Sequence, residues 1–133
     1  MATIWTIGHS THSFEEFVAM LNSFRVECLV DIRSFPGSRR YPHFNKEALQ
    51  SSLPLENIDY IHLPGLGGRR KAKSDSKNSA WHNASFRGYA DYMETEEFEK
   101  AVNELEKIAN EKNCFVIYRL HYITSKQIWM IRL

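Results

Sequence analysis

The residues best suited to chemistry lie in one short segment, where an apolar run ends at an acid and continues into arginines. Asp31 closes the run, and Arg33, Arg39 and Arg40 follow it. A carboxylate at the end of a buried strand is costly unless it is paired, which predicts an arginine partner, Arg33 or Arg87. Packing in a core cannot explain Arg39 and Arg40, because the loop that holds them is polar. We therefore expect them to bind an anionic ligand. The alternative is that both side chains are simply solvated at the surface.

Further reactive side chains follow two other predicted strands. His9, Ser10 and Thr11 come after the first strand, and His62 ends the third. In open parallel sheets ligands bind beyond the carboxyl ends of the strands, so these side chains should meet Asp31 at one edge. His9, Asp31 and His62 are therefore candidate catalytic residues for acid–base or metal-assisted chemistry. In the simpler alternative the histidines cap a helix or bond backbone groups, and Asp31 serves only in an ion pair.

A second basic segment lies in the long polar stretch 64–86, where 69–73 carries four bases and no acid. Aromatic and basic groups interleave after it, which suits nucleotide or single-strand contacts, although most charge runs are simply solvated. The six histidines form no close pair on a helix, so we assign no metal ligands. The candidate anion-binding residues are Ser10, Thr11, Arg33, Arg39, Arg40, Arg69, Arg70 and Arg87.

These side chains must be positioned by alternating strands and helices. Apolar runs at 4–7, 28–32, 60–63 and 114–118 predict strands. Helical spacing predicts helices that follow Ser13, cover 46–53 and follow Thr95, with regular structure also near 87–93. The order predicts a three-layer α/β fold, with a mostly parallel sheet of about 4–5 strands flanked by helices. The helix that follows Ser13 should point free amide donors at the same edge as Asp31.

Composition sets the broad class. The chain has 133 residues, 43% of them hydrophobic and 25% charged, which is typical of a single folded domain and excludes disorder. No apolar run is long enough to span a membrane and no secretory signal is visible, so we expect a cytoplasmic protein without a membrane partner. Cys28 and Cys114 open apolar runs and should be buried, reduced thiols. The acids in 94–112 should form a solvated helix face.

Five blocks of sequence, in order, resemble the DUF488 family of uncharacterised bacterial and archaeal proteins. They are WTIGHST at 5–11, LVDIRSFPGSR at 29–39, FN at 44–45, HLPGLGGRR at 62–70 and FRGYADYM at 86–93. The resemblance extends from residue 3 to about residue 117. It implies an α/β fold and no established activity.

The C-terminal segment departs from the family pattern. After the strand that ends near Tyr118, that pattern continues into Cys-x-Glu and then Cys-His-Arg at the start of another helix, and neither is present here. The resemblance implies that any chemistry needing those cysteines is lost, or that the C-terminus is replaced or truncated. We therefore divide the chain into a DUF488-like domain at 1–118 and a divergent tail at 119–133. The tail is expected to form a short helix that packs Ile123, Ile128 and Ile131 on the sheet.

The strand at 29–33 is also similar to the Asp-x-Arg strand of rhodanese-like domains, so the fold is expected to be distantly rhodanese-like or Rossmann-like. The loop that corresponds to the rhodanese catalytic loop holds Arg119 and His121 but no cysteine, which disfavours sulfur transfer. Two functions remain open. One is the binding of an anionic small molecule, a nucleotide or nucleic acid, and the other is a small enzyme acting on an anionic substrate. The sequence indicates no particular cofactor, and a homodimer through an exposed last strand is a further expectation.

Overall fold

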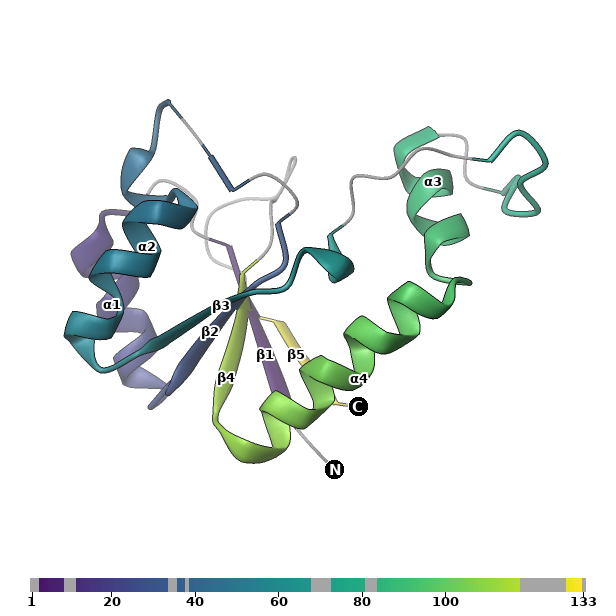
Figure 1. The fold of residues 1–133 in the computed structure, drawn as a ribbon. Coiled ribbons are helices and arrows are strands. Elements are labelled where there is room, and N and C mark those ends of the chain that lie inside the picture. The colour runs from purple at the N-terminus through teal and green to yellow at the C-terminus, as the bar shows by residue number, and fades with distance from the viewer. Residues whose placement is uncertain are drawn as a thin grey trace.

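The computed structural model describes residues 3–8, 12–33, 36–37, 39–67, 73–80, 84–117 and 129–132. Within these ranges five strands form one sheet in the order β3-β2-β4-β1-β5 (Figure 1). The first four in chain order run parallel, and the fifth is antiparallel to β1. The strands are β1 (Thr3–Ile7), β2 (Cys28–Asp31), β3 (Asp59–His62), β4 (Cys114–Ile117) and β5 (Trp129–Arg132).

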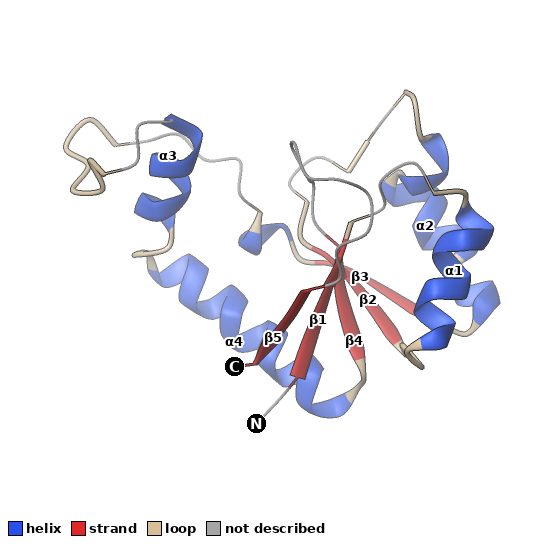
Figure 2. Ribbon diagram, turned by 180° about the vertical axis from the view of Figure 1, so that it is seen from behind, coloured by secondary structure: helices blue, strands red, loops and turns tan. Residues whose placement is uncertain are grey.

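Helices cover both faces of the sheet (Figure 2). One face packs Leu29 and Phe115 against α1 (Phe14–Ser23) and α2 (Lys46–Ser52). The other face packs Val30 and Val116 against α4 (Glu96–Glu111). Alternate residues of β2 and β4 thus enter different cores, which is why these strands are apolar on successive residues. The predicted three-layer α/β fold with a mostly parallel sheet is confirmed.

The predicted helix starts also lie where the sequence placed them. Ser13 caps α1 in a capping box, in which its hydroxyl accepts from the Glu16 amide at 3.1 Å. Thr95 caps α4 by accepting from the Phe98 amide at 3.3 Å. Helix α3 begins earlier than the sequence predicted. The remaining helices are α3 (Ala84–Tyr92) and the short 3₁₀ helices η1 (Pro42–Phe44), η2 (Pro54–Glu56) and η3 (Pro64–Leu66).

The segment after β3 lies close against α4. Gly65 in η3 approaches α4 so closely that a Cβ atom there would lie 2.9 Å from the Cβ of Ala101, which only glycine avoids.

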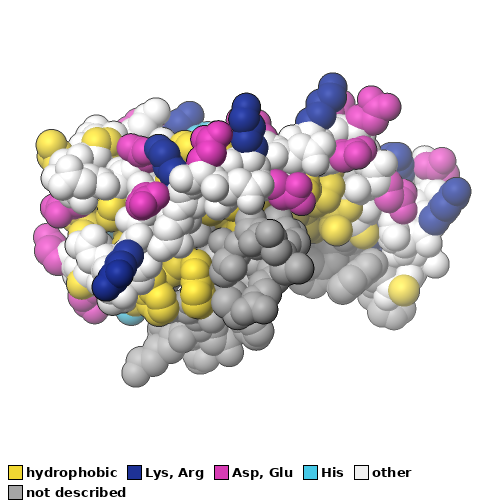
Figure 3. All heavy atoms as spheres, turned by 90° about the horizontal axis from the view of Figure 1, so that it is seen from below, with side chains coloured by type: hydrophobic (Ala, Val, Ile, Leu, Met, Phe, Trp, Pro, Cys, Tyr) yellow, Lys and Arg dark blue, Asp and Glu magenta, His cyan; other side chains and the backbone are white. Residues whose placement is uncertain are grey.

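Most acids of α4 are exposed, as predicted for a solvated helix face. Figure 3 shows acidic and basic side chains interspersed over the surface seen from below. No helix among the described residues is both long and apolar enough to cross a bilayer.

The prediction of a C-terminal helix is wrong for the last described residues. Ile131 lies in β5, where it pairs with Ile4 of β1, while Ile123 and Ile128 lie outside the described residues. The physical reason is the outer edge of β1, whose unpaired backbone donors and acceptors are satisfied by pairing with an added strand. The last parallel strand, β4, lies between β2 and β1, and the edges of the described sheet are β3 and β5. The homodimer stays a prediction.

The core assignment predicts a large difference between two leucines. Leu29 is fully buried in the interior strand β2, whereas Leu55 is 83% exposed. We expect Leu29→Ala to lower the free energy of unfolding by about 2–5 kcal/mol, because it leaves a cavity in the core. The same change at Leu55 should stay within about 0.5 kcal/mol. Urea denaturation of both variants checks this, and similar costs at the two positions would contradict the packing described.

Candidate functional site

The carboxyl ends of β2 and β3 form a topological switch point. After β2 the chain turns toward α1 and α2, where Phe44 is buried. After β3 it turns toward the opposite face, where Leu63 and Leu66 pack near α4. The two strands are neighbours, and Asp31 pairs in register with His62. Ligand sites of open α/β sheets form where adjacent strands send their connections to opposite faces, so this is the expected place for one.

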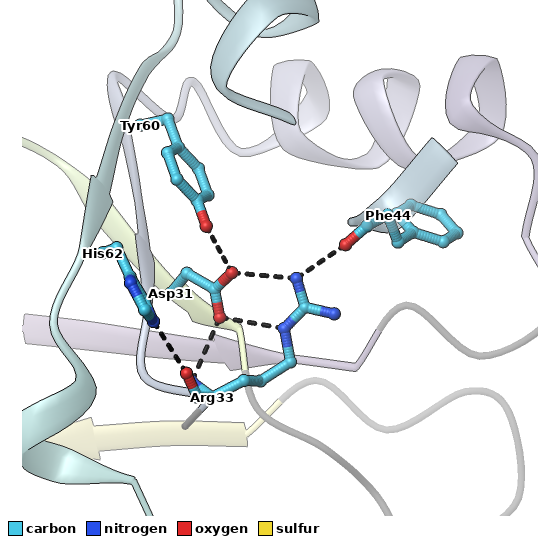
Figure 4. Close-up of polar contacts among 5 residues, drawn as sticks. All are labelled: Asp31, Arg33, Phe44, Tyr60 and His62. Carbon is cyan, nitrogen blue, oxygen red and sulfur yellow. Dashed lines mark hydrogen bonds and ion pairs between the residues drawn. The ribbon is translucent and has the colours of Figure 1, made fainter. Parts of the chain in front are cut away.

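Asp31 is fully buried at this switch point and forms a complete set of hydrogen bonds (Figure 4). Its Oδ1 accepts from the amide of Arg33 at 3.1 Å and from Arg33 Nε at 2.8 Å. Its Oδ2 accepts from Arg33 Nη2 at 2.8 Å and from the hydroxyl of Tyr60 at 2.5 Å. The predicted arginine partner is confirmed as Arg33. Because both oxygens are occupied by donors, the carboxylate serves here as the anchor of an ion pair.

Arg33 is held on one side and left open on the other. The residue is only 8% exposed, and its Nη2 also donates to the carbonyl of Phe44 at 2.7 Å. Its second terminal nitrogen, Nη1, makes no hydrogen bond with any described residue, and in Figure 4 it points away from Asp31 and Tyr60. Asp31 already occupies the bidentate edge of the guanidinium. What remains is one nitrogen with two N–H donors.

Tyr60 and His62 brace this arrangement from β3. Burial raises the pKa of Tyr60, and its hydrogen bond to the Asp31 carboxylate and the charge of that carboxylate raise it further. His62 Nε2 lies 2.8 Å from the carbonyl oxygen of Arg33. Because a carbonyl only accepts, Nε2 must carry the proton in this bond. His62 therefore fixes the backbone after β2, and it makes no hydrogen bond to its register partner Asp31.

Tyr60 was not among the predicted site residues. A signal for it exists, because side chains two apart on a strand share a face. The register pairs Tyr60 with Leu29 and His62 with Asp31, so the phenol lies diagonally across from the carboxylate. Finding it from the sequence would have required the register of β2 against β3, which no local pattern supplies.

The start of α1 differs from the expectation of free, anion-seeking donors. The Ser13 amide donates to the Glu16 carboxylate at 3.3 Å, and the Glu16 amide donates to the Ser13 hydroxyl. The prediction is therefore wrong for these two amides, because the helix supplies its own anion. The carbonyl of His12 faces His43 Nε2 at 3.0 Å, which ties the start of α1 to η1.

The other predicted anion-binding residues are not all gathered here. Arg39 and Arg40 are exposed in the segment between β2 and η1, and the Arg40 guanidinium lies 5.6 Å from the centre of the Tyr41 ring. Arg87 lies on α3 beside Lys73 and Ser76 and is not a partner of Asp31. The roles of these arginines stay predictions. Five of the predicted residues lie outside the described residues, namely His9, Ser10, Thr11, Arg69 and Arg70.

Cysteine and metal chemistry have little support in the described part of the chain. Cys28 and Cys114 are both fully buried, as predicted, and they pair in register on β2 and β4. Burial raises the pKa of the Cys28 thiol to about 12 and also raises that of Cys114, which disfavours the reactive thiolate. Among the described residues, no three His, Cys, Asp or Glu side chains group so as to hold a metal ion.

Comparison with known protein families shows which family this chain matches. The model of a family described as a domain of unknown function, DUF488, matches residues 13–124. The chain belongs to the DUF488 family. The matched DUF488 region includes Asp31, Arg33, Tyr60 and His62, and begins after the first strand. Comparison with curated proteins and with solved structures gives no match. The division of this DUF488 chain at residue 118 stays a prediction.

The environment of Tyr60 predicts an unusual titration. Because its pKa is raised on folding, Tyr60 contributes stability that is fully present below about pH 10, the unfolded value, and is lost as the pH rises further. At about pH 11, while the protein stays folded, wild type and Tyr60→Phe should give the same phenolate absorbance. The reason is that Tyr60 stays protonated in wild type and is absent from the variant. A larger phenolate signal from wild type would contradict the buried hydrogen bond to Asp31.

Proposed function

We propose that this protein binds an anionic ligand, a phosphate-bearing small molecule, nucleotide or nucleic acid, at the carboxyl edge of its sheet. The observation that carries the proposal is Arg33, which is buried and fixed at the β2–β3 switch point with Nη1 left without a partner among the described residues. No buried side-chain nitrogen or oxygen of the described residues lacks a hydrogen-bond partner, so Nη1 reaches solvent, where a ligand oxygen can replace the water that hydrates it.

In this proposal the positive charge and the directed hydrogen bond come from different residues. Asp31 neutralises Arg33, so Nη1 offers a directed hydrogen bond more than a net positive charge. The net positive charge comes from Arg39 and Arg40, which are exposed and form no ion pair with a described carboxylate. Exposed guanidinium groups attract a polyanion from a distance, and added salt screens that attraction. The fixed Nη1 of Arg33 instead forms a directed hydrogen bond with one oxygen of the ligand. The ring of Tyr41 beside Arg40 adds an aromatic surface of the type on which bases stack.

An acid–base enzyme that uses His9, Asp31 and His62 has weaker support. Both oxygens of Asp31 and the Nε2 atom of His62 are engaged in bonds that fix the chain. A general base needs a free lone pair that faces the substrate proton, and the oxygens of Asp31 do not offer one; in His62 the Nε2–H holds the Arg33 carbonyl and the lone pair is on Nδ1. We therefore take Asp31 and His62 as positioning residues for Arg33.

The test is a titration with labelled single-stranded DNA, RNA and mononucleotides at several salt concentrations. Wild type is compared with the double variant Arg39→Ala, Arg40→Ala. We expect the double variant to bind about tenfold more weakly, and the slope of log affinity against log salt to fall by about 1 to 2 for the oligonucleotides. Fluorescence anisotropy measures the oligonucleotides, and calorimetry measures the mononucleotides.

The matched control is the double variant Lys100→Ala, Lys107→Ala. It removes the same amount of charge from exposed positions of α4, on the opposite face of the sheet from η1. Its affinity should remain close to that of wild type. Unchanged binding by the arginine variant, or an equal loss in the lysine variant, would refute a site at this edge.

A further inference from the structure

Residues 73–80 form a loop that a single carboxylate holds against α3. Asp91 of α3 is 2% exposed. It accepts hydrogen bonds from the Ser76 hydroxyl at 2.6 Å, from the Asn78 side-chain amide at 2.8 Å and from the Lys73 backbone amide at 2.8 Å. The bonds from Ser76, Asn78 and Lys73 lower the pKa of Asp91, so it is charged at neutral pH. The loop is thus fixed around a buried anion by neutral donors.

Among the described residues, Arg87 has no ion-pair partner in this arrangement. It lies one helical turn before Asp91, at the spacing where an arginine and an aspartate on a helix commonly pair. The loop takes up the oxygens of Asp91 instead, and partly buried Arg87 forms no hydrogen bond or ion pair with any described residue. The N–H groups of its guanidinium can therefore donate hydrogen bonds to a bound ligand.

A hollow of about 400 Å³ lies between the loop and the helix. Among the described residues two cations and three hydroxyls line it, and no carboxylate does: Lys73, Ser74, Ser76, Ser79 and Arg87. Asp91 is covered by its three donors, and the exposed Asp75 of the same loop is not part of the lining. The lining from the described residues is mainly polar, which suits a hydrated oxyanion better than a hydrophobic ligand.

We propose that this hollow is a second anion site, which binds the phosphate group of a small molecule. Lys73 and Arg87 supply two positive charges, which match a phosphate monoester of charge about −2 better than a carboxylate. The hydroxyls of Ser74 and Ser79 are available as donors. Ser76 has a positioning role, because its hydroxyl donates to Asp91 and accepts from the Asn78 amide at 3.2 Å.

This site is separate from the one at the sheet edge. It is built from α3 and the loop before it, which lie on the α4 side of the molecule, away from α1 and α2 (Figures 1 and 2). It also contains none of the residues that carry the proposed function. Either site can therefore fail its test without affecting the other.

The test is an NMR titration of the whole chain with inorganic phosphate, matched in ionic strength by sodium chloride. We expect saturable shifts of the Ser74, Ser76 and Asn78 amides with phosphate and not with chloride. Arg87→Gln and Lys73→Gln should each weaken binding about tenfold, as expected for the loss of a charge-assisted hydrogen bond. Because Arg87 has no described partner, Arg87→Gln should keep the Lys73 amide protected from hydrogen exchange, which shows that the loop is intact.

Two control variants separate this site from its alternatives. Lys100→Gln removes an exposed lysine from α4 and should leave the phosphate shifts unchanged. The double variant Arg39→Ala, Arg40→Ala should also leave them unchanged. Equal responses to chloride and phosphate, wild-type affinity in both Arg87→Gln and Lys73→Gln, or a loss of the shifts in the Arg39 and Arg40 variant would overturn the proposal.

Discussion

The ion pair between Asp31 and Arg33 is the interaction on which the polar edge of this sheet depends. Both partners are buried, and their bidentate contact is completed by Tyr60 and by the carbonyl of Phe44. Losing one partner of a buried pair costs about 3–5 kcal/mol, a large part of the about 5–15 kcal/mol that holds a typical domain together. The pair links the end of β2 to β3 and to η1, so it fixes the relative positions of three segments.

The two proposed sites use a buried aspartate in the same way. At the sheet edge Asp31 fixes a guanidinium and leaves one of its nitrogens open. On α3, Asp91 fixes a loop with neutral donors and leaves Arg87 without a partner among the described residues. In both cases donors of the protein occupy the oxygens of the carboxylate, and at the sheet edge Arg33 also neutralises its charge. The cationic groups then remain oriented toward solvent or ligand.

The sequence was sufficient for the features that depend on local pattern. Leu29 and Val30 are apolar in succession because helices cover both faces of β2, and Ser13 with Glu16 marks the start of α1. The strand at 129–132 was missed because a short apolar run suits a helix or a strand, and the open edge of β1 decides between them. The Asp91 contacts were missed because they join a helix to a loop residue 13 to 18 positions earlier, which no local pattern reports.

The most direct test of the central claim is the response of the Arg33 guanidinium to an anion. Arginine side-chain N–H signals, assigned by comparison with Arg33→Lys, are followed by NMR as inorganic phosphate is added. If Arg33 presents a fixed donor to the ligand, its Nη1 protons shift and exchange more slowly, while the Nε proton bonded to Asp31 changes little. Phosphate that shifts only Arg39 and Arg40, with the Arg33 signals unchanged, would contradict the claim.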